Sequence, residues 1–499
     1  MASVHELLLE RIRNVSRLQS VGQLLDWDQE TYMPRGGLAA RAEQMSLLAG
    51  LAHENLVSEE TRRLLDQSGA ANDDSELSAN LRETRRAFDR AARVPTDLVK
   101  TIAHESTLAK EAWVRARKES RFEHFAPRLR TLIDLKKQVA DRIGYDTEPY
   151  DALMDEFEPG AKARDVEALF EELRAFTVDV LRRIQSAPRK PDPSILERSY
   201  DRAKQEALSR SAAESLGFDF ERGRADVSVH PFCTTIGGGG DVRITTRYDE
   251  RFLPAALFGT MHEVGHALYE QGLLPEHRFT PMGEAASLGI HESQSRMWEN
   301  LVGRSRPFWV HHFPKLREMF PEALRDVSLD QFHGAINAVR PSLIRVEADE
   351  VTYNLHIILR FEIERALFTG ALDVNGIPTA WNEKMRSSLG VTPPNDADGC
   401  LQDIHWSLGG FGYFPTYTLG NLYAAQFMEK ARADLPTLDE SIAANDHKPL
   451  LNWLRTNIHR HGRRYRPGEL VRRVTGRELS IDAFRRYVNT KFLPIHGLA

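Results

Sequence analysis

The stretch FLPAALFGTMHEVGHALYEQG, residues 252–272, sets the interpretation of the whole chain. Pro254 near its start and Gly272 at its end are typical of the two ends of a helix. Apolar side chains recur at helical spacing on one side, at Leu257, Met261, Val264 and Leu268. We therefore expect a helix that is covered on both faces, as a helix inside a protein is.

The same stretch contains the pentapeptide HEVGH, residues 262–266. On a helix His262 and His266 lie about one turn apart on one face, so both imidazoles can bind one metal ion. Glu263 is rotated by about 100° from the first histidine, which keeps it out of the ligand set but lets it act as general base on a metal-bound water. An accidental match among the 18 histidines is the alternative, and three fixed positions in five seldom coincide by chance.

A catalytic zinc site needs a third protein ligand and one open position. Tyr269 and Gly272 stand where a metzincin has Gly and His, so that arrangement is excluded. A carboxylate on a later helix is the other source, and GIHESQSRMWENLVG, residues 289–303, supplies Glu292 and Glu299. We favour Glu292, although a surface ion pair with Arg296 four residues later explains it nearly as well.

Composition limits the class of protein. The 499 residues are 41% hydrophobic and 28% charged with a formal net charge of -6, which indicates a globular protein and gives no reason to expect nucleic acid. The two cysteines are too few for a disulfide framework, so a metal must be bound by histidine and carboxylate. Since we find no signal peptide and no apolar run of roughly 18 residues, we expect a soluble cytoplasmic protein without a membrane partner.

Apolar residues recur at helical spacing to about Gly223, and the pattern of apolar and polar residues then changes. DVSVHPFCTT and DVRITTRY flank a run of four glycines, which predicts a small β-hairpin. The glycines are more typical of a flexible turn than of a phosphate-binding loop. We expect one mainly α domain with two lobes, a helical lobe over residues 1–225 and a catalytic lobe over 226–499. The segment GGFGYFPTYTLGN, residues 409–421, resembles an ordered loop that lines a cleft.

Six short motifs resemble those of the carboxypeptidase Taq family of HExxH metallopeptidases. They are HPF at 230–232, DVRIT at 241–245, HEVGH at 262–266, HESQ at 291–294, IRVEAD at 344–349 and GCLQDIHW at 399–406. The resemblance implies that His262, His266 and Glu292 bind the metal and that Glu263 is general base and acid. It also implies a helical body with a deep active-site groove, and a homodimer.

An enzyme that removes the last residue of a peptide must recognise a free carboxylate, which arginine does best. Arg345 and Arg243 are the candidates. We expect a helix after Ile344 with one polar stripe of Arg345, Asp349, Thr352 and His356, in which Asp349 orients Arg345. Arg243 lies in the predicted hairpin, whose strand can also pair with the substrate backbone. Either arginine can instead be an ordinary surface charge.

For the oxyanion of the tetrahedral intermediate, the glycine- and aromatic-rich region offers His405, Tyr417 and Tyr413 as hydrogen-bond donors. All three can equally be packing residues.

The residues together predict a zinc metallocarboxypeptidase that releases single amino acids from the carboxyl end of peptides, with cobalt or manganese as other possible ions. A zinc oligopeptidase or aminopeptidase, or a non-catalytic helical peptide-binding protein, are the alternatives. Met297–Asn300 is similar to an aminopeptidase motif, but it lacks the preceding glycine and follows the HExxH helix instead of preceding it. No residue pattern indicates the preferred C-terminal side chain.

Overall fold

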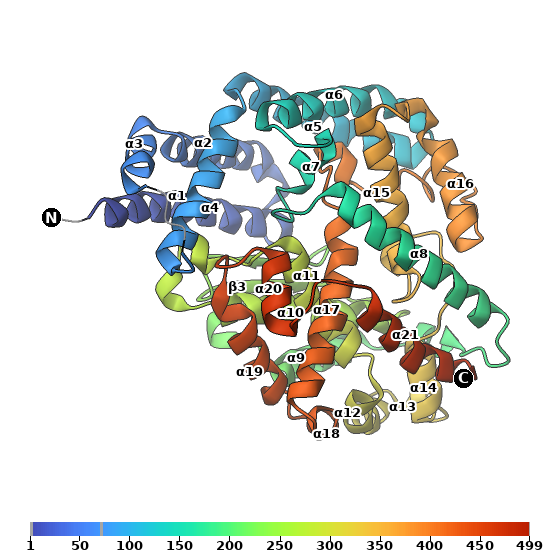
Figure 1. Ribbon diagram of the computed structural model, residues 1–499. Coiled ribbons are helices and arrows are strands. Elements are labelled where there is room, and N and C mark those ends of the chain that lie inside the picture. Colours follow the sequence, from blue (N-terminus) through green and yellow to red (C-terminus); the bar gives the residue numbers. More distant parts are fainter. Residues whose placement is uncertain (1–2, 70–72, 499) are drawn as a thin grey trace. The chain divides into compact units, whose positions relative to one another are not determined.

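A computed structural model describes residues 3–69 and 73–498 of the chain. The described part consists mainly of helices with one small sheet, which confirms the predicted fold class (Figure 1). The chain forms two compact units: unit 1 contains Met1–Ala92, Asp192–Ile336 and Tyr423–Leu479, and unit 2 contains Arg93–Pro191, Asn337–Leu422 and Ser480–Ala499. The division into lobes at about residue 225 and the deep groove stay predictions.

Unit 1 carries the sheet and most of the helices. Its helices are α1 (Val4–Thr31), α2 (Leu38–Leu56), α3 (Glu59–Ser68), α4 (Glu76–Arg93), α9 (Arg202–Leu216), α10 (Leu253–Gly272), α11 (Leu288–Arg296), α12 (Arg306–Met319), α13 (Pro321–Leu324), α14 (Leu329–Ile336), α18 (Leu438–Ala443), α19 (Lys448–Asn457) and α20 (Pro467–Thr475). Its strands are β1 (Gly223–Val227), β2 (Cys233–Thr235) and β3 (Val242–Thr246).

Unit 2 is built from long helices. They are α5 (Thr96–Glu119), α6 (Ala126–Ile143), α7 (Pro149–Met154), α8 (Ala163–Gln185), α15 (Tyr353–Thr369), α16 (Ile377–Leu389) and α21 (Asp482–Ile495). Helix α17 (Pro415–Asp434) begins in unit 2 and ends in unit 1. The predicted helical character of the first half of the chain is thus confirmed by α1 to α9.

Helix α10 is buried on nearly all sides. Pro254 occupies its first turn, where the missing N–H costs no hydrogen bond, and the backbone turns to an extended conformation at Leu273. Apolar residues such as Met261, Val264 and Leu268 are fully buried. The predicted interior helix is confirmed.

The sheet has the strand order β1-β3-β2, with β3 in the middle. Strands β2 and β3 are antiparallel and form the predicted hairpin, while β1 pairs with β3 in parallel. The glycine run makes the predicted turn, with positive φ at Gly237 and Gly238. It packs against the end of α10, because a Cβ on Gly239 would lie 2.4 Å from the carbonyl oxygen of Glu270.

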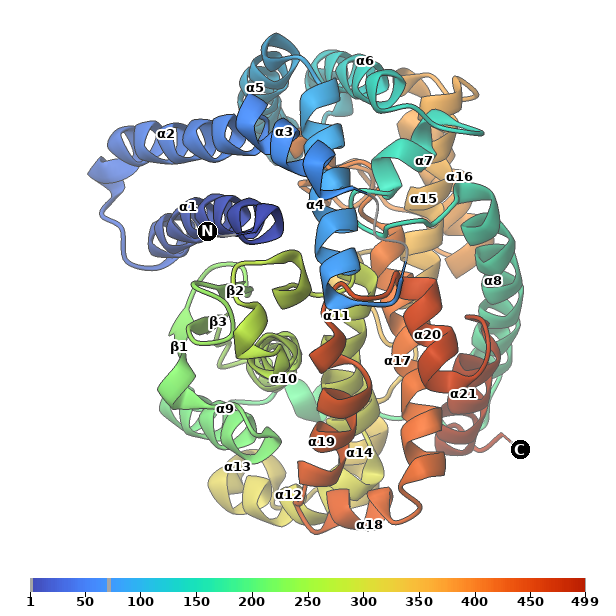
Figure 2. The ribbon, with the colours of Figure 1, turned by 60° about the vertical axis from the view of Figure 1, so that its left-hand side comes forward.

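Helices α10 and α11 cross at very short range (Figure 2). The contact is made at Gly265, the fourth residue of the pentapeptide. A Cβ there would lie 2.5 Å from the Cα of Ser295 and 2.6 Å from the carbonyl oxygen of Gln294. Only glycine lets the two backbones approach so closely.

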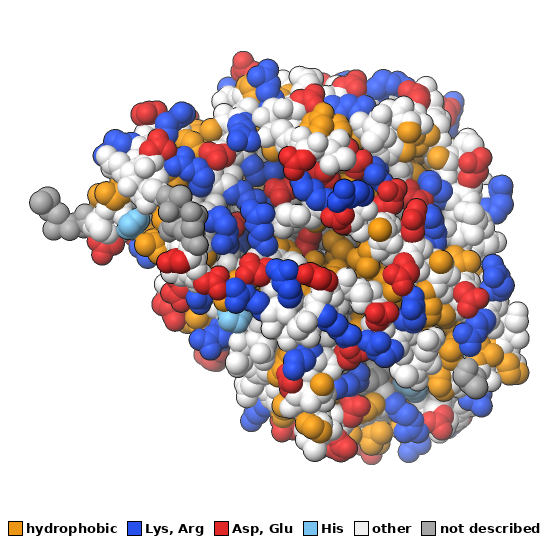
Figure 3. All heavy atoms as spheres, in the orientation of Figure 1, with side chains coloured by type: hydrophobic (Ala, Val, Ile, Leu, Met, Phe, Trp, Pro, Cys, Tyr) orange, Lys and Arg blue, Asp and Glu red, His pale blue; other side chains and the backbone are white. Residues whose placement is uncertain are grey.

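Acidic and basic side chains are intermixed on the face of the molecule shown in Figure 3, in keeping with the small formal net charge of -6. Within residues 3–69 and 73–498, no helix combines the length and apolar character needed to cross a bilayer.

We predict that Gly265→Ala destabilises the protein by about 2 kcal/mol or more, because the new methyl group must push α10 and α11 apart. Gly259→Ala on the same helix is the matched control, since a Cβ there meets nothing within 4 Å. That substitution is expected to leave stability unchanged or to raise it by up to about 1 kcal/mol. Urea unfolding monitored by circular dichroism measures both, and equal effects at the two positions would contradict the close crossing.

Candidate metal centre

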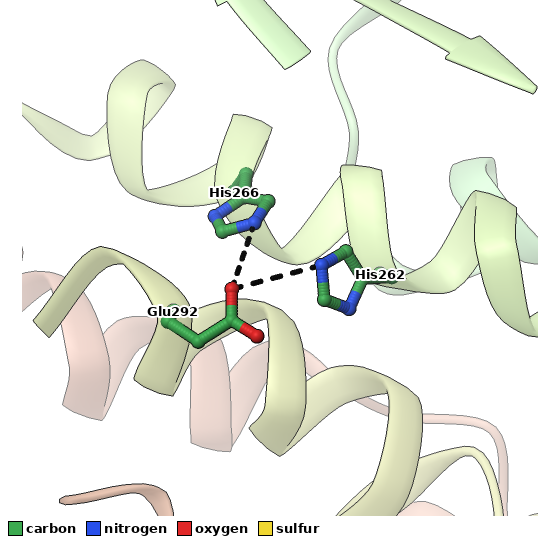
Figure 4. Close-up of side chains that lie close together, drawn as sticks. All are labelled: His262, His266 and Glu292. Atoms are coloured by element: carbon green, nitrogen blue, oxygen red, sulfur yellow. Dashed lines mark ion pairs between the residues drawn. The ribbon is translucent and has the colours of Figure 1, made fainter. Parts of the chain in front are cut away.

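Three side chains converge where α10 and α11 cross: His262, His266 and Glu292 (Figure 4). The Nε2 atoms of His262 and His266 lie 3.8 and 3.5 Å from Oε2 of Glu292. Ligands of a tetrahedral ion with bonds of about 2.1 Å are about 3.4 Å apart, so this spacing fits a zinc-sized ion. Among the described residues, no other group of three His, Cys, Asp or Glu side chains lies as close together.

The protonation states of Glu292 and His266 suit a metal. Burial alone would raise the pKa of Glu292, but the Arg296 guanidinium and His262 outweigh it and hold that pKa well below its usual value. Arg296 donates from Nε to Oε1 of Glu292 at 2.7 Å. Burial, reinforced by His291, lowers the pKa of His266 to about 3. An ionised carboxylate and a neutral imidazole are the forms that bind metals.

Glu263 follows His262 on α10 but stands outside the converging trio. Its side chain is buried, and burial raises its pKa to about 7. Its Oε2 has no hydrogen-bond partner among the described residues. A carboxyl group with a pKa near neutrality can both accept and release a proton at physiological pH.

Glu299, the alternative ligand in the sequence, takes a different position. It lies in a π-helical turn, Met297–Val302, and its Oε2 is 2.9 Å from Nδ1 of His262, the ring nitrogen that faces away from Glu292. Burial opposes ionisation of Glu299, but the hydrogen bond with His262 and the charge of Arg296 lower its pKa to about 2. Glu299 thus fixes the orientation of one imidazole, a role that sequence reasoning missed.

The predicted residues of the aromatic segment lie together in unit 2. His405 Nε2 is 3.3 Å from the Tyr417 hydroxyl, and the Tyr413 and Tyr417 rings are 5.3 Å apart. Burial lowers the pKa of His405 to about 4, with Arg345 contributing, so its imidazole is neutral. The expected loop ends earlier than predicted, because α17 begins at Pro415 and Tyr417 lies in its first turn.

Arg345 is nearly fully buried, with 6% of its surface exposed. It donates from Nε and Nη2 to Oδ1 of Asp403 at 3.0 and 2.8 Å, and from Nη1 to the Tyr353 hydroxyl at 2.8 Å. A second buried guanidinium, that of Arg360, donates to the other carboxylate oxygen of Asp403. Asp403, which lies in the GCLQDIHW motif, was not singled out in the sequence.

The predicted helix from Ile344 is wrong. Arg345–Glu347 is a short 3-10 turn, Ala348 is extended, and α15 begins only at Tyr353. The carboxylate of Asp349 instead closes a turn before the helix, where it accepts hydrogen bonds from the N–H groups of Val351 and Thr352. Asp403, and not Asp349, therefore orients Arg345.

Arg243 lies on β3 with its guanidinium 4.2 Å from the centre of the Trp27 ring on α1. Asp241 accepts hydrogen bonds from its Nε and Nη2 at 2.9 and 2.8 Å. Its neighbours Val242 and Ile244 are buried on the face of the sheet that packs against α10. Because strand side chains alternate between faces, Arg243 lies on the opposite face of the sheet from the metal helix.

Two half-buried histidines and a buried carboxylate, with a glutamate beside them on an HExxH helix in a mainly α fold, define a metallopeptidase of the helical type. Comparison with known proteins specifies the family. Residues 7–492 match the family model described as carboxypeptidase Taq (M32) metallopeptidase. The chain belongs to this family, and it is a metallocarboxypeptidase.

Individual relatives support the assignment over the whole length. Thermostable carboxypeptidase 1 of Thermus thermophilus is 46% identical, with 99% of each chain covered. Carboxypeptidase 1 of Bacillus subtilis is 38% identical, with 98% of this chain and 97% of the relative covered. The crystal structure of the M32 carboxypeptidase from Deinococcus radiodurans superposes with a TM-score of 0.96 at 40% identity, covering 100% of both chains.

We predict that Glu299→Gln weakens zinc binding by about 10- to 100-fold, because the His262 ring loses the charged acceptor that holds it. Competition with a coloured chelator measures the dissociation constant directly. Glu276→Gln, on an exposed turn of the same unit, is the control and should bind zinc like the wild type. Unchanged affinity in Glu299→Gln would show that the ring is held by other contacts.

Proposed function

We propose that the enzyme is a zinc carboxypeptidase that hydrolyses the last peptide bond of a peptide and releases single amino acids. The observation that carries the proposal is the placement of Nε2 of His262 and His266 within 4 Å of Oε2 of Glu292, with Glu263 next to this trio. The chemistry of this donor set suits zinc, while cobalt or manganese can occupy the same ligands.

His262, His266 and Glu292 would hold a divalent ion, which when bound would acidify a water molecule and polarise the scissile carbonyl. In our proposal Glu263 accepts the proton of the attacking water and then donates it to the leaving amine. The raised pKa of about 7, caused by burial, supports both halves of this transfer. Arg296 keeps Glu292 ionised, and Glu299 fixes the orientation of the His262 ring.

For the oxyanion we propose His405 and Tyr417, with Tyr413 packed beside them. Their hydrogen bond and ring contacts support a common role, because one preorganised group can donate to a developing negative charge. The lowered pKa of His405 keeps it neutral, so one ring nitrogen carries a proton to donate.

Two arginines remain candidates for the substrate carboxylate. Arg345 and Arg360 share the single carboxylate of Asp403, which leaves one excess positive charge beside His405 and Tyr417. Such a charge in a dry environment attracts an anion strongly. Arg243 is more accessible, with 16% of its side chain exposed, but it lies on the far face of the sheet from α10. We therefore rank Arg345 first, and Asp349, whose carboxylate closes the turn before α15, ranks below it.

The family favours a carboxypeptidase over the alternatives of an oligopeptidase, an aminopeptidase or a non-catalytic peptide-binding protein. Peptides with a free C-terminal carboxylate are the proposed substrates. A homodimer and a cytoplasmic location stay predictions.

We predict that Glu263→Gln retains zinc but loses at least about 100-fold in kcat, because no other group at that position transfers the proton. Glu292→Ala is expected to lose zinc on dialysis, since the remaining two imidazoles bind it weakly. Metal content by atomic emission and hydrolysis of an acetylated dipeptide measure the two properties separately. Full activity of Glu263→Gln prepared free of wild-type enzyme would contradict the assignment of Glu263 as general base.

We predict that an N-acetylated peptide with a free carboxyl end is hydrolysed one residue at a time, while its C-terminal amide is cleaved at least about tenfold more slowly. A chelator should abolish the activity and added zinc restore it. Cleavage of the amide at the same rate would favour an oligopeptidase instead.

The same pair of peptides separates the two arginines. Arg345→Lys and Arg243→Lys each remove a paired donor while keeping the charge. Substitution of the arginine that binds the carboxylate should raise KM for the free peptide by about 10- to 100-fold, with little effect on the amide. Substitution of the other arginine should leave the preference for the free peptide over the amide unchanged.

A further inference from the structure

We infer that His291 is a positioning residue that holds the imidazole of His266 in place by ring stacking. The inference rests on the proposed role of His266 as a metal ligand and adds a residue to which no part in the reaction has been assigned. It comes from a difference in how the two histidines of the pentapeptide are supported.

The His262 ring is held by a hydrogen bond, because Glu299 lies 2.9 Å from its Nδ1. The His266 ring has no such support. Its Nδ1 is buried and has no hydrogen-bond partner among the described residues. Histidines that bind metals nearly always have a partner on the second nitrogen, which prevents rotation of the ring. Something else must therefore fix the orientation of His266.

His291 lies flat against this ring. The two ring centres are 4.4 Å apart and the planes differ by 19°, so the rings are stacked. Stacked aromatic pairs at this distance attract each other beyond the burial of their area. A ring packed in this way also blocks rotation of His266, since any turn about its Cβ–Cγ bond drives an edge into the neighbouring plane.

His291 is itself fixed on two sides. Its Nε2 is 2.9 Å from Oε1 of Glu270 on α10, and the Tyr269 ring lies 5.6 Å from it. His291 lies outside the group of side chains that converge on the candidate metal position, so it acts as a support and not as a fourth ligand. Glu270 is four residues after His266, so the carboxylate and the supported ring lie on one face of α10.

The arrangement depends on the crossing of the two helices. His291 directly precedes Glu292 on α11, and consecutive residues on a helix point about 100° apart. When α11 approaches α10 at Gly265, it places Glu292 beside both Nε2 atoms and His291 against the flank of His266. Helix α11 therefore supplies both Glu292, the proposed third ligand, and His291, which supports the second ligand, His266.

Two variants of His291 test the inference, because one keeps the ring and the other keeps the contact with Glu270. His291→Phe keeps a flat ring but cannot contact Glu270 through a nitrogen, whereas His291→Gln keeps a polar end for Glu270 but has no ring. We expect His291→Phe to bind zinc within about threefold of the wild type and His291→Gln to bind it at least about tenfold more weakly. Chelator competition gives the dissociation constants, and the visible spectrum of the cobalt-loaded proteins reports the ligand geometry independently of turnover.

His459→Gln is the matched control. The buried ring of His459 lies 4.9 Å from Tyr269, and Tyr269 in turn lies beside His291, so the His459 ring is separated from His266 by two other rings. It should bind zinc like the wild type, and urea unfolding of the metal-free proteins shows whether each variant is folded. The inference is overturned if His291→Gln binds zinc normally, if His291→Phe is as weak as His291→Gln, or if His459→Gln is as weak as both. His266→Ala tests the proposed ligand set separately: zinc retained in that variant refutes the proposed function, whatever the His291 variants show.

Discussion

The close crossing of α10 and α11 at Gly265 is the constraint on which the metal centre depends. Neither helix contains a complete site. The first carries two imidazoles that share a face, and the second carries a carboxylate that reaches both only if the backbones nearly touch. A single methyl group on Gly265 would clash with the backbone of α11, so the two helices could not approach closely enough to bring the three side chains together.

Two carboxylates near this crossing are paired with arginines. The carboxylates of Glu292 and Glu299 both lie near Arg296, and Arg304 approaches Glu299 from the other side. Burying so many charges is costly unless each is paired. The pairing keeps both carboxylates ionised, the form in which Glu292 can bind a cation and Glu299 can hold the His262 ring. Glu263 has no arginine partner of this kind, and burial raises its pKa to about 7, so its carboxyl group can exchange a proton near neutral pH.

Local patterns in the sequence predicted the parts of the structure that depend on short distances along the chain. The HExxH helix and the β2–β3 hairpin follow from spacing within one element, and both are confirmed. The polar stripe after Ile344 fits a helix equally well on paper, but Asp349 starts the helix instead of continuing it. Preference for Glu292 needed the family motifs, because Glu299 has an equivalent spacing. The stacking of His291 on His266 and the sharing of Asp403 by two arginines depend on how separate helices cross, which no spacing within one segment reveals.

The interleaving of the two units has a consequence for biosynthesis. The chain passes back and forth between them, and unit 2 receives its last segment only after Ser480. Within that segment Tyr487 and Lys491 bind the carboxylate of Glu350, a residue made long before. Domains that are contiguous in sequence can fold one after another as they leave the ribosome. Here both units wait for distant segments, so a nascent chain exposes unfinished apolar surfaces until the residues from Ser480 onward are made, and no single cut in the chain separates one intact unit from the other.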